Sequence, residues 1–116
     1  MDFYETLSVK RDASADDIRK LALDVRGRLP QQRPAAVVIA GIPADRPAVV
    51  VAVNEPGRAL GLAAGALVRS AAQALGGGGG GRDDIAQGGG APQGDRAGQA
   101  ISEAFDAVRA VVRDMT

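Results

Sequence analysis

The chain has 116 residues, of which 46% are hydrophobic, and its 14 Lys and Arg residues are balanced by 14 Asp and Glu residues. This length suits one small domain with a modest core. The zero formal charge excludes the strongly basic surface of an independent nucleic-acid-binding protein. Because the sequence contains neither cysteine nor histidine, disulfides, zinc fingers, thiol nucleophiles and imidazole bases are excluded, and only a carboxylate metal site stays open.

No apolar run approaches the ~20 residues that a membrane-spanning helix requires. The opening residues, MDFYE, lack the positive and apolar regions of a secretory signal. We therefore expect a cytoplasmic protein with no membrane partner.

The first twelve residues, MDFYETLSVKRD, contain two of the three aromatic residues of the chain. They resemble the opening of a J-domain, and the resemblance implies a first helix that packs through Phe3, Tyr4, Leu7 and Val9. J-domain activity requires a His-Pro-Asp loop, and this chain has no histidine. We expect residues 1–12 to be a non-functional lead that either docks on the main core or frays.

A helical pattern extends from Ser14, a suitable N-cap, to Leu29, which precedes a proline. Two β-branched runs of strand length follow at residues 35–40 and 48–53. Neither run alternates polar and apolar residues, so both strands should be covered on two faces. The breaker-rich turn between them favours antiparallel pairing.

Helical spacing returns from Arg58 to Leu75, interrupted by Gly61 and Gly65, which either break the helix or allow close packing on the sheet. Residues 84–87 form a short strand candidate. The residues expected in the core include Leu21, Val25, Val50, Leu67, Phe105 and Val108.

The last apolar periodicity predicts a C-terminal helix that Asp95 can cap. The order is therefore helix, strand, strand, helix, glycine loop, strand, helix. It predicts an α+β fold in which helices cover a small mixed β-sheet.

The stretch from Gly76 to Gly90 reads GGGGGGRDDIAQGGG. Its first glycine can end the preceding helix, and glycine N–H groups can approach an anion closely. The run lacks serine and its spacer has the content of a strand, so we expect an ordered functional loop rather than a linker. It is not a P-loop, because Arg82 replaces the phosphate lysine and Asp83 the hydroxyl that binds magnesium.

The same stretch resembles the C-terminal, DHH-associated domain of alanyl-tRNA synthetase. That family has a glycine run closed by Arg, then an acidic residue and an Ala-Gln-glycine segment, here Gly76–Gly81, Arg82, Asp84 and the segment 86–90. Residues 64–69 also fit, and the resemblance covers residues 13–116. Where the family often has proline, this chain has Asp83.

The resemblance implies a domain that contacts tRNA outside the aminoacylation site and helps to couple aminoacylation to editing. The catalytic and editing domains are missing, so this chain alone should neither charge nor edit tRNA. The implied partners are an alanine-specific tRNA and the remainder of a synthetase, with a homodimer as a further arrangement. No cofactor and no metal site are expected.

Arg82 is the leading candidate for contact with nucleic acid, because a planar guanidinium suits phosphate and stacks on bases; the alternative is a salt bridge to Asp83 or Asp84. Gln87 can bond a ribose or base, or the backbone of its own loop. The expected nucleic-acid-binding residues are Gly76, Gly77, Gly78, Gly79, Gly80, Gly81, Arg82, Gln87 and Arg69.

Two other functions stay open. A DHH-type phosphoesterase has an accessory substrate-binding domain with a related glycine motif, but that motif typically ends in histidine. A protein-interaction module would use the lead or the C-terminal helix.

Overall fold

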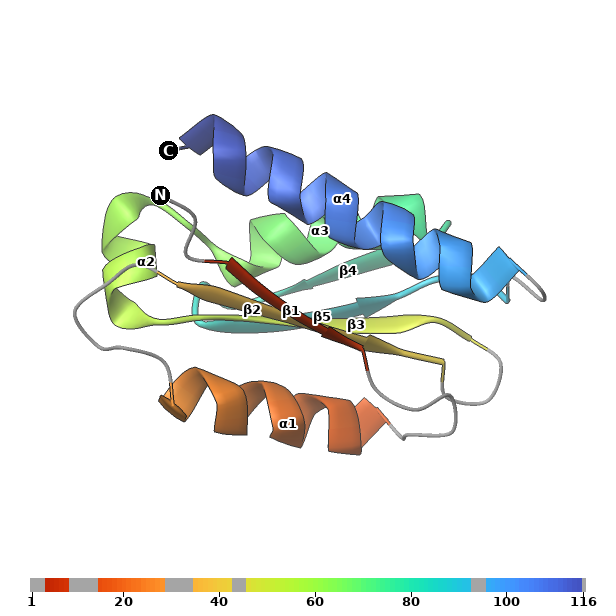
Figure 1. Ribbon diagram of the computed structural model, residues 1–116, viewed down its shortest axis with the longest axis horizontal. Helices are drawn as coiled ribbons and strands as arrows, with labels where there is room; N and C mark the ends of the chain where they lie inside the picture. Colours follow the sequence, from red (N-terminus) through yellow and green to blue (C-terminus); the bar gives the residue numbers. More distant parts are fainter. Residues whose placement is uncertain (1–3, 9–14, 29–34, 43–45, 93–95, 116) are drawn as a thin grey trace.

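The sheet at the centre of the protein has five strands in the order β1-β2-β3-β5-β4. The computed structural model describes residues 4–8, 15–28, 35–42, 46–92 and 96–115 (Figure 1). β1 runs parallel to β2 and every other neighbouring pair is antiparallel, so the sheet is mixed, as predicted. The strands are β1 (Tyr4–Ser8), β2 (Ala36–Gly41), β3 (Ala48–Val53), β4 (Gly78–Gly81) and β5 (Ile85–Gly89).

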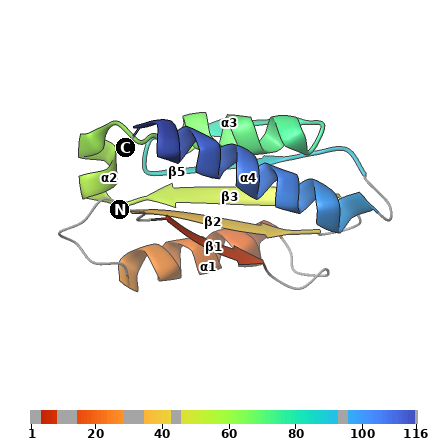
Figure 2. The ribbon, with the colours of Figure 1, turned by 45° about the horizontal axis from the view of Figure 1, so that its top comes forward.

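Helices cover both faces of this sheet. One face carries α1, which packs on β2 and β3, and the other carries α3, which packs on β3, β4 and β5. α4 lies against α3, and Figure 2 shows the two helices side by side above the sheet. The described helices are α1 (Ala15–Arg28), α2 (Glu55–Leu60), α3 (Ala64–Ala74) and α4 (Ala97–Met115), and none of them is long and apolar enough to cross a membrane.

The two central strands are buried on both faces. Every residue of β2 and all but the first of β3 are buried. Val37 and Val50 pack toward α1, whereas Val38 and Val51 pack toward α3 and α4. This two-sided burial explains why the runs do not alternate polar and apolar residues. Of the six expected core residues, Val50, Leu67 and Val108 are buried, and Leu21, Val25 and Phe105 are half-buried.

The helix predicted from Arg58 to Leu75 is two helices. α2 begins earlier, because the Oδ1 atom of Asn54 accepts hydrogen bonds from the N–H groups of Gly57 and Ala35, each at 2.9 Å. The chain leaves α2 at Gly61, whose φ of 109° favours glycine. The break that Gly61 allowed is therefore confirmed.

Residues 4–8 form strand β1, not the helix that the J-domain resemblance implies. All five pair with β2, from Tyr4 opposite Ala36 to Ser8 opposite Ala40. The physical reason is that β2 would otherwise present an unpaired sheet edge, and β1 satisfies its backbone groups. The division of the chain into residues 1–12 and 13–116 stays a prediction. The expected helix caps Ser14 and Asp95 lie outside the described residues.

The expected glycine loop is also wrong, because residues 78–81 form strand β4. β4 pairs with β5 along its whole length, from Gly78 opposite Gly89 to Gly81 opposite Ala86. The short strand expected at residues 84–87 exists as β5. The α+β class is confirmed, with β1, β4 and the division between α2 and α3 as the changes to the predicted order.

Candidate nucleic-acid interface

The glycine run and the Ala-Gln-glycine segment form one hairpin at the edge of the sheet. The N–H group of Arg82 donates to the carbonyl oxygen of Ile85 at 3.0 Å, so Asp83 and Asp84 form the turn. The first glycine of the run lies before this hairpin: Gly76 has a φ of 78° and donates its N–H group back to α3. Its role as the end of that helix is as predicted.

One face of the hairpin needs glycine because two backbones approach each other there. A Cβ atom added to Gly79 would lie 2.6 Å from the Cα atom of Gly88, and one added to Gly81 would lie 2.7 Å from the Cα atom of Ala86. Gly88 itself lies under Ala72 of α3, with only 3.2 Å between an added Cβ and the alanine methyl group. On this face, glycine allows β4 to pack against its neighbours without side chains between them.

The other face of the hairpin is open. A Cβ atom added to Gly78 or Gly80 would meet no described atom within 4 Å. α1 covers another part of this same face of the sheet. Ile85 of β5 packs into the hydrophobic cluster under α1, and Gln87, two residues later in the strand, lies on the same face. α1 itself packs on β2 and β3. Packing within the described part of the chain therefore does not explain why these two positions are glycine.

The turn of the hairpin is fixed to the start of α3. The N–H group of Ala64 donates to the carbonyl oxygen of Asp83 at 2.9 Å, and that of Gly65 donates to the carbonyl oxygen of Arg82 at 3.1 Å. A Cβ atom on Gly65 would lie 3.0 Å from the Gly81 oxygen, so glycine allows this close approach. These bonds satisfy N–H groups that a helix otherwise leaves free at its N-terminus. Close packing at Gly65 is confirmed, and these N–H groups are not available to an anion.

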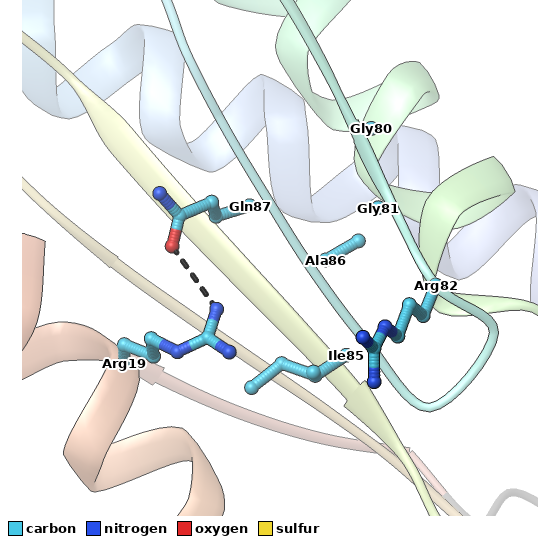
Figure 3. Close-up of a pocket in the computed structure, with 7 residues that line it drawn as sticks. All are labelled: Arg19, Gly80, Gly81, Arg82, Ile85, Ala86 and Gln87. Atoms are coloured by element: carbon cyan, nitrogen blue, oxygen red, sulfur yellow. Dashed lines mark hydrogen bonds between the residues drawn. The ribbon is translucent and has the colours of Figure 1, made fainter.

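A pocket of about 320 Å³ lies on the open face, at the turn end of the hairpin. Figure 3 shows Gln87 and Arg19 directed toward each other, and the Nη1 atom of Arg19 donates to Oε1 of Gln87 at 3.4 Å. This contact joins α1 to β5 across 68 positions of sequence, and no local pattern could have revealed it. The pocket is lined by Arg19, Gly80, Gly81, Arg82, Ile85, Ala86 and Gln87, with no acidic side chain among them.

Asp84 of the turn is paired with α1 and not with Arg82. Asp84 forms an ion pair with Arg26 at 3.8 Å, and its side chain also accepts the N–H group of Ile85 at 3.0 Å. Arg26 further donates to the main-chain oxygen of Asp84 at 3.1 Å. Among the residues that the structure describes, Arg82 forms no ion pair. The salt bridge from Arg82 to Asp83 or Asp84 that the sequence left open is therefore not found among the described residues, and Arg82 is exposed at the pocket.

The candidate residues do not all lie together. Gly80, Gly81, Arg82 and Gln87 meet at the pocket, and Gly78 continues the same open face. Arg69 is exposed on α3, which covers the opposite face of the sheet. The described residues contain no group of three acidic or other metal-binding side chains that could hold a metal ion. The arrangement is suited to binding an anion with a guanidinium and an open backbone surface.

The described residues thus form an α+β domain whose edge is a hairpin of glycines, docked on α3 and bordered by arginine and glutamine. The chain matches the DHHA1 domain over residues 3–114 and belongs to that family. The crystal structure of the C-Ala domain from Aquifex aeolicus alanyl-tRNA synthetase has the same fold, with a TM-score of 0.71 and 27% identity. The alignment covers 90% of this chain and 89% of that one.

Alanine–tRNA ligases are similar in sequence. The chain is 65% identical over 85 residues to the enzyme of Thermobifida fusca, which is 73% of this chain and 10% of that protein. It is 49% identical over 109 residues to the enzyme of Streptomyces avermitilis, which is 94% of this chain and 12% of that protein. The chain thus spans about a tenth of the length of these curated relatives. The resemblance to the C-terminal domain of alanyl-tRNA synthetase is confirmed.

Proposed function

We propose that this domain binds tRNA as a non-catalytic part of an alanine–tRNA ligase, through the open face of the β4–β5 hairpin. The similar alanine–tRNA ligases support the assignment to that enzyme, and the similar C-Ala domain supports the assignment to its C-terminal domain. The observation that carries the proposal is the pocket itself, in which Arg19 and Arg82 border Gly80 and the described residues of the lining include no acidic side chain.

The pocket suits a phosphate group of the tRNA backbone. Guanidinium groups bind phosphate through paired, charge-assisted hydrogen bonds. Gln87 holds the guanidinium of Arg19 at the edge of the pocket, and Gly80 lets the ligand approach the main chain without obstruction. Arg69 stays a candidate for a separate contact, because a ligand as large as tRNA can extend beyond one face of the domain.

The domain acts as an appendage in this proposal. The chain carries no net charge, so its own affinity for RNA is weak. Attachment to the catalytic domains raises the effective concentration of tRNA at the hairpin. We propose that it assists aminoacylation and editing of an alanine-specific tRNA in the cytoplasm, that the chain alone catalyses neither reaction, and that a homodimer is compatible with this role.

Fluorescence anisotropy with a labelled alanine tRNA transcript tests the proposal. Arg82→Gln should weaken binding by about 1–3 kcal/mol and reduce the slope of log K against log salt by about 0.9. Arg109→Gln is the matched control, because Arg109 is exposed on α4, which lies on the other side of the sheet. Equal binding by wild type and Arg82→Gln at low and moderate salt would place the site elsewhere. No binding by the wild type even at low salt, where a weak electrostatic site binds most strongly, would favour a protein-interaction module.

A further inference from the structure

A second pocket lies on the same hairpin, at the end away from its turn. Its volume is about 540 Å³, and its lining includes Arg46, Ala48, Gly78 and Gly89. Arg46 comes from the segment just before β3, and its side chain is exposed. As in the first pocket, the described residues of this lining include no acidic side chain.

The two pockets are neighbours on one face of the sheet. Ala48, Gly89 and Gly78 stand side by side on β3, β5 and β4, and Ala48 packs against the cluster under α1. Gly80, which lines the first pocket, follows Gly78 by two residues, so the two rows are about 7 Å apart along the strand. An added Cβ at either glycine meets no described atom within 4 Å, so no described side chain separates the pockets.

A positive group stands at each end of this open surface. Arg19 and Arg82 border the pocket at the turn, and Arg46 borders the other. Within the described ranges, Arg46 and Arg82 form no ion pair. Two cationic sites joined by an unobstructed surface favour a ligand with two linked anionic groups over a single small anion.

We propose that the two pockets form one continuous site for two phosphates of the same nucleic-acid strand, which runs along β4 and β5 from Arg82 to Arg46. The inference rests on the proposed function and deepens it. Arg82 and Arg46 border opposite ends of the hairpin, so the two phosphates need not be neighbours in the strand, and the path between the pockets passes over the main chain at Gly80 and Gly78. Arg46 is thereby assigned as a binding residue that the glycine motif does not contain.

Salt titrations of binding to the labelled tRNA transcript test this inference, with Arg46→Gln, Arg82→Gln, their double variant and the Arg109→Gln control. Arg46→Gln should weaken binding roughly tenfold, the scale of one charge-assisted contact. Each single variant should lower the salt slope by about 0.9, and the double variant by about twice that amount. Circular dichroism should show unchanged folding, because the side chain of Arg46 is exposed.

A second variant tests the path itself. Gly78→Val places a side chain on the open face, where its Cβ atom meets no described atom within 4 Å, so it should fold as the wild type does and bind the transcript at least tenfold more weakly. If Arg82→Gln weakens binding while Arg46→Gln and Gly78→Val behave like Arg109→Gln, the second pocket is not part of the site and the inference is overturned. If neither Arg82→Gln nor Arg46→Gln weakens binding, the tRNA site does not lie on this hairpin, and the site of the proposed function fails together with the inference.

Discussion

Neighbouring glycines of β4 should respond in opposite ways to the same substitution. In Gly79→Ala the new methyl group would lie 2.6 Å from the Cα atom of Gly88 and 3.0 Å from the oxygen of Gln87. These neighbours are main-chain atoms of the paired strand, which cannot turn aside as a flexible side chain can. Gly80→Ala places the same methyl group where no described atom lies within 4 Å.

The magnitudes follow from these surroundings. Overpacking of this kind costs about 1–3 kcal/mol, so Gly79→Ala should lower the free energy of unfolding by that amount. Gly80→Ala should raise it by about 0.4–1 kcal/mol, because alanine restricts the unfolded chain more than glycine does. Neither position has a positive φ, so backbone strain does not oppose alanine at either one. The two variants should therefore differ by about 1.5–4 kcal/mol.

Urea unfolding followed by circular dichroism measures this difference. The variants should share one m-value and differ in midpoint, and Gly78→Ala should repeat the behaviour of Gly80→Ala because its position is equally open. The reasoning is refuted if Gly79→Ala is as stable as Gly80→Ala, or if Gly80→Ala proves the less stable of the two. In that case β4 would not lie on β5 as described.

Three further perturbations test other parts of the fold. Asn54→Ala should cost about 1–3 kcal/mol in urea unfolding, because two buried N–H groups lose their acceptor; Asn54→Asp, which keeps an oxygen, should cost less. Leu67→Ala should cost about 2–5 kcal/mol, because Leu67 is buried. Phe105→Ala should cost less than about 3 kcal/mol, the lower end of the range for a fully buried phenylalanine, because Phe105 is half-buried; a loss of about 5 kcal/mol would contradict this burial. Deletion of residues 1–12 should leave a domain that still unfolds cooperatively but is less stable. The full chain should not stimulate the ATPase activity of Hsp70. If it does, and if the deletion abolishes this stimulation, the lead has J-domain activity.

The helices and strands that were predicted correctly contain side chains whose polarity indicates whether each position is buried or exposed. β3 begins and ends at the predicted residues, and α1, described from Ala15 to Arg28, lies within its predicted range, because apolar side chains mark the buried faces. Glycine has no side chain, so the sequence of a glycine strand cannot be distinguished from that of a glycine loop. β4 becomes a strand only because β5 and α3 lie against it, and that contact is set by tertiary structure.

The lead and the pocket could not be predicted for a related reason. β1 pairs with a strand about thirty residues away, and a run of five residues carries too little periodicity to separate strand from helix. The residues of the pocket were partly predicted, since Arg82 and Gln87 belong to the glycine motif. Arg19 and Arg46 come from α1 and from the segment before β3, and only the folded chain brings them to the hairpin.

The zero net charge of the chain does not describe the field at this hairpin. Among the described residues, four ion pairs join Asp24 with Arg28, Asp84 with Arg26, Glu103 with Arg96 and Asp106 with Arg109. The described residues of the two pocket linings include arginine and no acidic side chain. Because exposed charges act over about 8–10 Å at physiological salt, a phosphate on this face responds to the local arginines and, near the turn, also to the exposed Asp83. The salt dependence of binding should therefore follow the number of arginines at the pockets, whatever the net charge of the whole chain.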